Sequence, residues 1–561
     1  MIKRLSEVIE KRLGTDSFEI DISEGEDRGH ISTNAAFVLA GREAFSPMDA
    51  AEEIRGYLHK NTASGLFEKI EVVKPGFINI WLTEETIKSE LERIVKEGSK
   101  WGKVKQVDPK TIIVEYSSPN IAKPMHVGHL RSTIIGDALA NILDYLGYKV
   151  IRWNWLGDWG TQFGKLIAAY KRWGKKSDLR EEPIDALNEL YVRFHKELEN
   201  NPELENEGRE EFRKLEEGDK ENRRLWRWFK KESLKEFSGL YDRLDITFDT
   251  QIGEAHYEKD LKDLIEDLKK KGIAQESEGA LMIDFGDEMP QAMIRKSDGA
   301  TVYLTRDIAS LLHRVDEYGA REILYVVSNE QALHFQQLEG VLKKMKLEKE
   351  VKMEHIKFGL VLGEDGRKLS TREGSAIRLV ELLDRAEDLA RKNLEKREGK
   401  YKKSELKEMA SIIGVGALKY NDLSQNRTSD IGFNWDKMLS FEGNSGPYLQ
   451  YTYARLESIL KKAKKIPKLN TDSLEEADLK IVIKMAQFPH ILERVAATKR
   501  PHYLASYLYD LSKQVNSYYH SEPVLYSNSE LRGARLNLVR SVNYILRGGL
   551  NLLGVEVVDR M

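Results

Sequence analysis

Cysteine is absent from the 561-residue chain, which excludes disulfides, thiolate catalysis and cysteine-ligated zinc sites. No apolar run approaches the ~20 residues that a membrane-spanning helix needs. Residues Met1–Glu7 become charged at once and do not lead into the apolar core of a signal peptide. We therefore expect a cytoplasmic protein that does not enter a membrane.

Apolar side chains are nonetheless abundant enough for several cores. Hydrophobic residues make up 41% of the chain and charged residues 32%, a balance typical of folded rather than disordered proteins. The length corresponds to roughly three to five domains of about 100–200 residues each.

The net charge of −3 averages over two unlike parts of the chain. Residues 376–561 contain 30 Lys and Arg against 23 Asp and Glu, a net +7, whereas the first 375 residues contain 59 against 69, a net −10. A basic C-terminal third fits a polyanion-binding surface. A solvated helical surface explains so small a surplus equally well.

Strand and helix patterns divide the chain into three predicted domains. Residues 1–100 form a small α/β domain, with two strands around the turn Pro75-Gly76. Residues 101–375 alternate strand and helix signals and include a highly charged helical insertion at about 175–245. Residues 376–561 lose the strand signal, which predicts an α-helical bundle.

The middle domain opens with a strand–helix–strand pattern. Residues Thr111–Tyr116 are rich in β-formers, and apolar residues then recur at helical spacing over Val127–Leu146. A second strand follows at Tyr148–Trp153. Because a helical crossover of this length joins parallel strands, we predict a βαβ unit within a parallel sheet.

The motif His126-Val127-Gly128-His129 lies between the first strand and its helix. A helix N-terminus offers unpaired N–H groups and a partial positive charge, which favour a phosphate. Gly128 lets a nucleotide approach the backbone, and His126 and His129 can donate to phosphate oxygens from one helix face. Alone the histidines could be helix caps, but the strand–loop–helix context favours a nucleotide site.

A second polar loop spans Gly363–Gly374 and carries three cations and two hydroxyl groups. Such a loop can fold over a triphosphate and neutralise its charge. By itself such a loop would more often be a solvated surface loop. Its charged and hydroxyl-bearing residues are Arg367, Lys368, Ser370, Thr371 and Arg372.

These two motifs together resemble the two signatures of class I aminoacyl-tRNA synthetases. The surrounding sequence narrows the resemblance to the arginyl-tRNA synthetases and extends it over essentially the whole chain. The stretches that carry it are Ser117–Asp137, Gly157–Gly164, Tyr303–Asp307, Gly416–Tyr420 and Met438–Arg455. The resemblance implies a Rossmann-type catalytic domain with a helical insertion, an N-terminal domain that contacts the tRNA elbow, and an α-helical anticodon-binding domain.

The same resemblance implies ATP-dependent attachment of L-arginine to its tRNA through an arginyl-adenylate, with release of AMP and pyrophosphate. No protein nucleophile is required, so positioning and charge stabilisation would carry the rate. Mg²⁺ would accompany the ATP phosphates, without a dedicated protein metal site. The expected partners are arginine tRNA, ATP and L-arginine, and we expect a monomer.

The resemblance also assigns the groups that act on ATP. One departure is that Thr371 stands where the usual second lysine of the loop would be, and Lys123, just before the histidine motif, can compensate. Another is Glu373, where the family commonly has lysine. The catalytic residues implied are His126, His129, Lys123 and Lys368. The ATP-binding residues implied are His126, Gly128, His129, Lys368 and Ser370.

A guanidinium is a planar fork that carboxylates match best, with a phenol nearby. Glu115 ends the first strand and Asp307 lies at a later strand–helix junction, and such positions adjoin the ligand site of an open α/β sheet. The resemblance implies that Glu115, Asp307 and Tyr303 hold the guanidinium. It further implies that Asn120 and Gln337 bind the α-amino and carboxylate groups.

Four residues are candidate tRNA contacts by resemblance. Phe77 and Asn79 lie in the N-terminal domain, although Phe77 could equally be part of a strand core. Trp435 and the terminal Met561 lie toward the anticodon-binding end, where most aromatic residues at helical spacing would be core.

Two other functions fit parts of the pattern. A class I synthetase for lysine or glutamine would share the histidine and lysine motifs but need not place acids at Glu115 and Asp307. A non-catalytic tRNA-binding paralogue would have no reason to keep Lys123, Lys368 and the histidine motif together.

Overall fold

The computed structural model describes residues 2–15, 18–21, 29–62, 65–175, 183–363, 366–367, 369, 377–396 and 401–561. Contacts divide the chain into two compact units, each described here by itself. The first comprises Met1–Val104, Phe441–Leu552 and Glu556–Met561, and the second comprises Lys105–Ser440 and Leu553–Val555.

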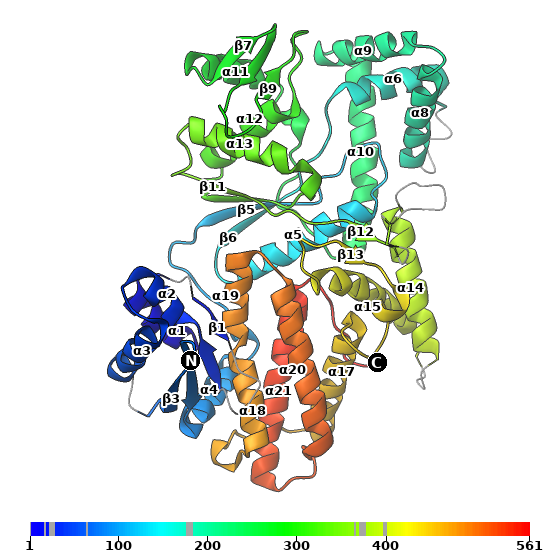
Figure 1. The fold of residues 1–561 in the computed structure, drawn as a ribbon. Helices are drawn as coiled ribbons and strands as arrows, with labels where there is room; N and C mark the ends of the chain where they lie inside the picture. The colour runs from blue at the N-terminus through cyan, green and yellow to red at the C-terminus, as the bar shows by residue number, and fades with distance from the viewer. Residues whose placement is uncertain are drawn as a thin grey trace. The chain divides into compact units, whose positions relative to one another are not determined.

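The N-terminal part of the first unit is an antiparallel sheet with helices packed against it (Figure 1). The sheet order is β1-β2-β4-β3. Its strands are β1 (Ile20–Asp21), β2 (Ile31–Thr33), β3 (Phe67–Val73) and β4 (Phe77–Leu82). The helices are α1 (Ile2–Leu13), α2 (Ala35–Arg42), α3 (Pro47–Asn61) and α4 (Glu84–Glu97), followed by the 3₁₀ turn η2 (Gly98–Lys100). Helix α3 starts where the Ser46 hydroxyl accepts from the Asp49 N–H, with Pro47 at its first position.

The C-terminal part of the first unit is helical. Its helices are α17 (Gly446–Ala463), α18 (Glu476–Ala486), α19 (Phe488–Thr498), α20 (His502–Ser521) and α21 (Ser529–Leu552), with the 3₁₀ turn η5 (Thr471–Ser473). A buried polar cluster ties three of them together. Asp478 of α18 accepts from Arg535 Nε of α21 at 3.2 Å and from the Tyr518 hydroxyl of α20.

A four-stranded parallel sheet forms the centre of the second unit, which confirms the predicted Rossmann-type fold. The strands are β5 (Thr111–Glu115), β6 (Lys149–Trp153), β10 (Glu322–Tyr325) and β11 (Lys352–His355), in the order β11-β10-β5-β6. Helix α5 (Val127–Tyr145) joins β5 to β6, whereas β10 lies on the other side of β5. The carboxyl ends of β5 and β10 therefore form the topological switch point, where such sheets bind ligands.

Short strands that the sequence analysis did not anticipate form a second, antiparallel sheet near the first. They are β7 (Ala274–Ser277), β8 (Ala280–Ile283) and β9 (Ala292–Arg295). Three helices share a hydrophobic core with this sheet and with β10. These helices are α11 (Leu261–Lys270), α12 (Tyr303–Asp316) and α13 (Ala332–Lys344).

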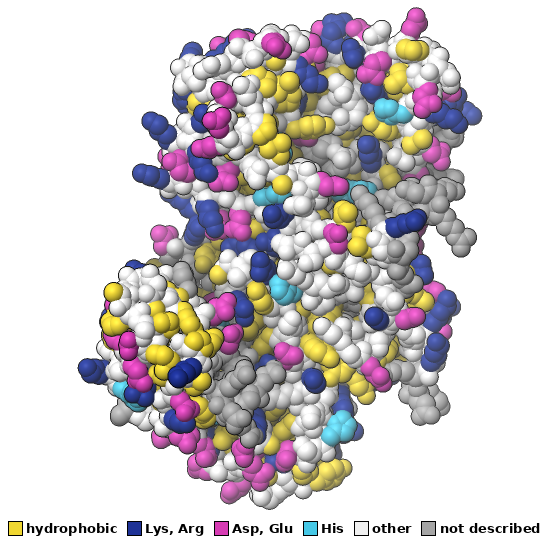
Figure 2. Space-filling model, viewed as in Figure 1, with side chains coloured by type: hydrophobic (Ala, Val, Ile, Leu, Met, Phe, Trp, Pro, Cys, Tyr) yellow, Lys and Arg dark blue, Asp and Glu magenta, His cyan; other side chains and the backbone are white. Residues whose placement is uncertain are grey.

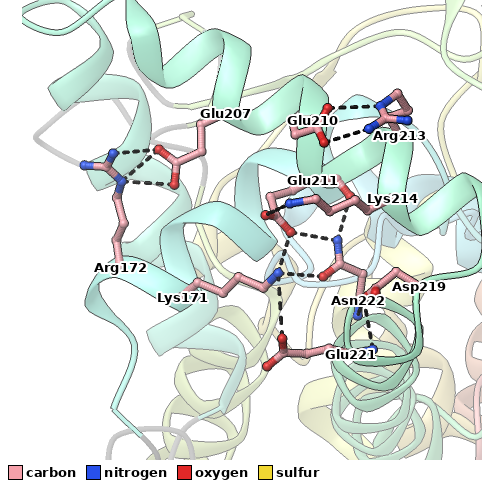
Figure 3. A network of polar contacts seen from close by, with 10 residues as sticks. All are labelled: Lys171, Arg172, Glu207, Glu210, Glu211, Arg213, Lys214, Asp219, Glu221 and Asn222. Carbon is pink, nitrogen blue, oxygen red and sulfur yellow. Dashed lines mark hydrogen bonds and ion pairs between the residues drawn. The ribbon is translucent and has the colours of Figure 1, made fainter.

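The charged stretch predicted as an insertion is helical, and ion pairs and hydrogen bonds hold its helices together. Its helices are α8 (Pro183–Leu198), α9 (Glu203–Glu216) and α10 (Lys220–Arg243), and they pack with α6 (Thr161–Trp173), which precedes the predicted stretch. Figure 3 shows the centre of this network, where the Lys171 ammonium contacts Glu211 Oε2 at 2.5 Å and Asn222 Oδ1 at 2.8 Å. Helices α6 and α9 cross closely at Gly164. A side chain at this position would not fit, because its Cβ would lie 2.1 Å from the Gly208 carbonyl oxygen.

The second unit ends with helices and a short parallel strand pair. The elements are β12 (Val361–Leu362), α14 (Leu379–Glu395), α15 (Lys403–Leu423), β13 (Ile431–Gly432) and α16 (Trp435–Met438). In the described part of the chain, no helix is both long and apolar enough to cross a membrane. On the face drawn in Figure 2, basic and acidic side chains are largely interspersed.

Candidate active site

The loop between β5 and α5 has an unusual backbone. Ser117, Ser118 and Ala122 have φ values of 71°, 49° and 61°, in the left-handed region that residues with a Cβ seldom occupy. Neighbouring side chains hold the loop in place, because the Ser117 N–H donates to Ser132 Oγ at 2.9 Å and the Ala122 N–H donates to Ser233 Oγ at 2.8 Å. Conformations of this kind occur preferentially at functional sites.

His126 and His129 lie at the head of α5 with their ring centroids 4.0 Å apart. His129 Nδ1 accepts from the His126 N–H at 3.1 Å, and His126 Nδ1 accepts from the Gly128 N–H at 3.1 Å. This pattern assigns a hydrogen to Nε2 of His129, and of His126 as well. Burial and the neighbouring His126 lower the pKa of His129 to about 3, so its imidazole is a neutral donor at pH 7.

Gly128 is required by the packing of these rings. A Cβ at this position would lie 2.9 Å from His126 Cε1, closer than real Cβ atoms come. The glycine therefore keeps the histidine ring in place as well as exposing the helix N-terminus.

Of the two lysines predicted to act on ATP, the described residues include Lys123 but not Lys368. Lys123 is half-buried, and its ammonium lies 4.6 Å from the centre of the Tyr191 ring of α8. Lys368 and Ser370 lie outside the described residues, as do Thr371, Arg372 and Glu373.

Arg131 of α5 is a residue that the sequence analysis missed. It is buried, forms an ion pair with Asp422 of α15 at 2.9 Å, and donates to the Gly359 carbonyl at 2.8 Å. Burial raises the pKa of Asp422 to about 6, while Arg131 opposes that rise. Because Gly359 lies two residues before β12, Arg131 holds the segment that enters this strand against α5. The sequence hinted at this role only by placing a single Arg, Arg131, among the residues of α5 that are buried.

The structure brings Glu115 and Asp307 into one cluster at the switch point. Burial raises the pKa of Glu115, the nearby charge of Asp307 adds to the rise, and Arg314 and His334 oppose it. Each acid already has a basic partner. An Arg314 N–H donates to Glu115 Oε2, and His334 Nε2 lies 2.6 Å from Asp307 Oδ2.

His334 joins Asp307 from the first turn of α13. Burial lowers the pKa of His334, but the hydrogen bond to Asp307 and the charges of Asp307 and Glu115 outweigh burial and raise it overall. The pair is partly accessible, with 26% of the His334 side chain and 21% of the Asp307 side chain exposed. A ligand can therefore reach Asp307 without unfolding the cluster.

The other predicted arginine ligands lie in the same unit. Tyr303 begins α12 one turn before Asp307, and 58% of the residue is exposed. Asn120 is exposed and fits against Gly157, where a Cβ would lie 2.1 Å from Asn120 Oδ1. Gln337 donates to two loop carbonyls, those of Pro290 and Gln291.

The candidate tRNA contacts differ in accessibility. Phe77 is 42% exposed at the start of β4, and its ring packs edge-on against Phe37. Asn79 of the same strand is buried and accepts from the Ser32 hydroxyl at 2.8 Å. Trp435 is half-buried beneath the Arg385 guanidinium, and Met561 is partly exposed.

The parallel sheet and the paired histidines define a class I synthetase fold, and comparison with known families agrees. The protein family described as "tRNA synthetases class I (R), catalytic domain" matches residues 90–435. "Arginyl tRNA synthetase N terminal domain" matches residues 1–82, and "DALR anticodon binding domain" matches residues 449–561.

Individual proteins are similar over the full length. A curated "Arginine--tRNA ligase" from Exiguobacterium sibiricum is 41% identical, over 99% of this chain and 98% of the relative. An "Arginine--tRNA ligase 1" from Bacillus cereus is 42% identical, over 94% and 92%. The chain therefore belongs to the arginyl-tRNA synthetase family, as its motifs predict.

Solved structures agree with this assignment. An arginyl-tRNA synthetase from Thermus thermophilus superposes with a TM-score of 0.86 at 25% identity, covering 100% of both chains. One from Plasmodium falciparum has a TM-score of 0.83 at 26% identity, covering 100% of this chain and 99% of that one. The predicted fold class, with its three kinds of domain, is confirmed.

Proposed function

We propose that this chain is an arginine–tRNA ligase, which attaches L-arginine to its cognate tRNA with ATP and releases AMP and pyrophosphate. The observation that carries the proposal is a cluster of acids at the carboxyl end of β5, the strand that leads to the histidine motif at the head of α5, in a chain similar to arginine–tRNA ligases along its whole length. Lysine and glutamine enzymes share the histidine motif, but the full-length relatives are arginine enzymes.

In the first step an oxygen of the arginine carboxylate attacks the α-phosphorus of ATP. The new O–P bond replaces the bond to pyrophosphate, which leaves, and arginyl-adenylate forms. His126 and His129 each accept a backbone N–H at Nδ1, which leaves Nε2–H as the donor, and the imidazole of His129 is neutral at pH 7. Such fixed donors stabilise charge that develops on the phosphoryl oxygens without having to reorganise.

Lys123 adds positive charge beside the same loop, and we assign Lys368 and Ser370 of the second signature to the ATP phosphates as well. In the second step a hydroxyl of the terminal tRNA ribose attacks the arginyl carbonyl, and AMP leaves. Neither step needs a protein nucleophile, so the enzyme acts by positioning its substrates.

Arginine is recognised through its guanidinium. Asp307 and Glu115 supply the carboxylates and Tyr303 a phenol that can accept from the same fork. Asn120 and Gln337 bind the α-amino and carboxylate groups and so aim the carboxylate at ATP.

Mg²⁺ enters with ATP and is coordinated chiefly by the phosphates. Among the described residues, no group of three or more His, Asp or Glu side chains is placed to hold a metal ion.

The tRNA is held by both ends of the chain. The N-terminal domain, residues 1–100, contacts the tRNA elbow, where the exposed Phe77 ring can stack on a loop base and Asn79 supports its strand. Residues 376–561, with Trp435 and Met561, serve the anticodon side, and residues 101–375 carry the chemistry. The enzyme works in the cytoplasm as a monomer.

Amino-acid-dependent exchange of pyrophosphate into ATP, measured with an arginine tRNA transcript present, tests this function. Of the amino acids tested in the presence of this tRNA, only arginine should support exchange. Exchange with lysine or glutamine would point to a different synthetase, and no exchange with any amino acid would point to a non-catalytic relative.

A further inference from the structure

A resident guanidinium lies inside the proposed arginine site. Arg314 of α12 is completely buried and donates to Glu115 Oε2 of β5. Its guanidinium lies 4.3 Å from the centre of the Trp153 ring, which is itself fixed by a hydrogen bond from Nε1 to the Ile252 carbonyl at 3.2 Å. Trp155 and Tyr325 are the next aromatic rings, at 5.5 and 5.6 Å. The buried cation is therefore surrounded by aromatic rings, which favour a positive charge.

The carboxylates of Glu115 and Asp307 are held in the same way, each by one basic side chain. Arg314 holds one oxygen of Glu115, and His334 holds one oxygen of Asp307. Among the described residues, no hydrogen bond reaches the second oxygen of either carboxylate. Each acid is therefore oriented by an internal base and keeps one oxygen for a ligand.

We propose that Arg314 is a positioning residue that determines specificity, because it fixes Glu115 and favours its ionised form, so that the second oxygen meets the substrate guanidinium as a charge. The inference rests on the proposed function, since it concerns the same amino-acid site. Glu115 is only 5% exposed, and a carboxylate this deeply buried takes up a proton unless a cation is close.

The groups facing Glu115 show why Arg314 decides its charge. Burial raises the pKa of Glu115, and Asp307 pushes it further up. Tyr257 and Tyr325 also lie near this carboxylate and are neutral, because burial raises the pKa of Tyr257 to about 12 and that of Tyr325 higher still. Arg314 lowers the pKa of Glu115 more than any other neighbouring group. His334 lowers it less, and the charge of His334 itself depends on pH.

A protonated Glu115 would change what the site selects. A carboxylic acid offers a donor as well as an acceptor, so it suits a neutral urea as well as a guanidinium. Citrulline, the neutral urea isostere of arginine, is therefore the probe. With Arg314 in place the site prefers arginine, and without Arg314 the preference should shrink.

The experiment compares the full-length enzyme with Arg314→Gln and Arg314→Lys by pyrophosphate exchange in the presence of tRNA, from about pH 6 to about pH 9. For Arg314→Gln we expect the arginine KM to rise roughly 10- to 100-fold at neutral pH, with the ATP KM unchanged. The preference for arginine over citrulline should fall about tenfold. The ratio of variant to parent KM should shrink as pH rises and Glu115 ionises, and Arg314→Lys should restore part of the preference.

Lys110→Gln is the matched control. Lys110 Nζ lies 2.7 Å from Oε2 of Glu322, another buried acid of the same sheet, at the amino end of β10. This variant also removes a cation beside a buried carboxylate, but at the opposite end of β10 from Tyr325, and Lys352 Nζ remains 3.8 Å from Glu322 Oε1. It should lower stability and leave the arginine KM, the citrulline discrimination and the pH profile as in the parent.

An Arg314→Gln enzyme with the arginine KM and citrulline discrimination of the parent would overturn the inference. If that variant does not fold, Glu115→Gln/Arg314→Gln removes both charges together and avoids an unpaired buried carboxylate. The double variant should lose arginine preference with no added pH dependence, and parental preference would again overturn the inference. A failure of the proposed function looks different, because the parent itself would then show no arginine-dependent exchange.

Discussion

Replacing Asp307 by Asn tests the recognition of arginine with the smallest change in shape. The substitution removes one negative charge and keeps an oxygen that can accept from His334, which lies 2.6 Å away in the parent. A hydrogen bond to a charged group contributes about 1.5–3 kcal/mol, and the partial exposure of Asp307 places the loss within rather than above that range. Since 1.4 kcal/mol is about tenfold, the arginine KM should rise roughly 10- to 150-fold.

The assay is pyrophosphate exchange with saturating tRNA, in which the arginine KM and the ATP KM are measured separately. The ATP KM should stay within about twofold of the parent, because the substitution leaves the head of α5 untouched. Asp316→Asn is the control, since Asp316 lies at the end of the same helix and is exposed. An Asp307→Asn enzyme with parental arginine kinetics would refute the assignment of Asp307 to the guanidinium.

Three further variants test the neighbouring groups. His129→Ala should lower kcat about 100-fold with little change in arginine KM, because one fixed donor to the phosphoryl group is lost; a large rise in arginine KM at unchanged kcat would reverse that role. Gly128→Ala should lower kcat about tenfold while thermal unfolding stays close to the parent, because the new Cβ displaces the His126 ring; parental kcat would show that the ring position is unimportant. The arginine KM of the parent should fall as pH rises through the pKa of His334. Once the imidazole is neutral, it no longer offsets the negative charge of Asp307, which then attracts the substrate guanidinium more strongly. His334→Gln should flatten that profile, and an equally steep profile in the variant would rule out His334 as its source.

The sequence predicted those parts of the fold that depend on local periodicity. The apolar run that forms β5 and the helical spacing of α5 are strong local signals, and the loop between them carries the histidine motif. The sheet of β7, β8 and β9 was missed because each strand has only four residues, too few for a periodic pattern to show.

The contacts that organise the site could not be predicted because they join residues far apart in the chain. Glu115 and Arg314 are 199 positions apart, and nothing local to either residue indicates the pair. Arg131 likewise reaches Asp422 through tertiary packing alone. The proton positions on His126 and His129 follow from backbone geometry, which the motif does not encode.

The central claim is that two acids hold the guanidinium while the paired histidines meet the reacting phosphorus. A crystal structure with a non-hydrolysable arginyl-adenylate analogue tests it most directly. The claim predicts the guanidinium between Glu115 and Asp307, with Nε2 of His126 and His129 at the phosphoryl position. An analogue bound with its guanidinium away from these acids, or its phosphoryl group away from the histidines, would contradict it.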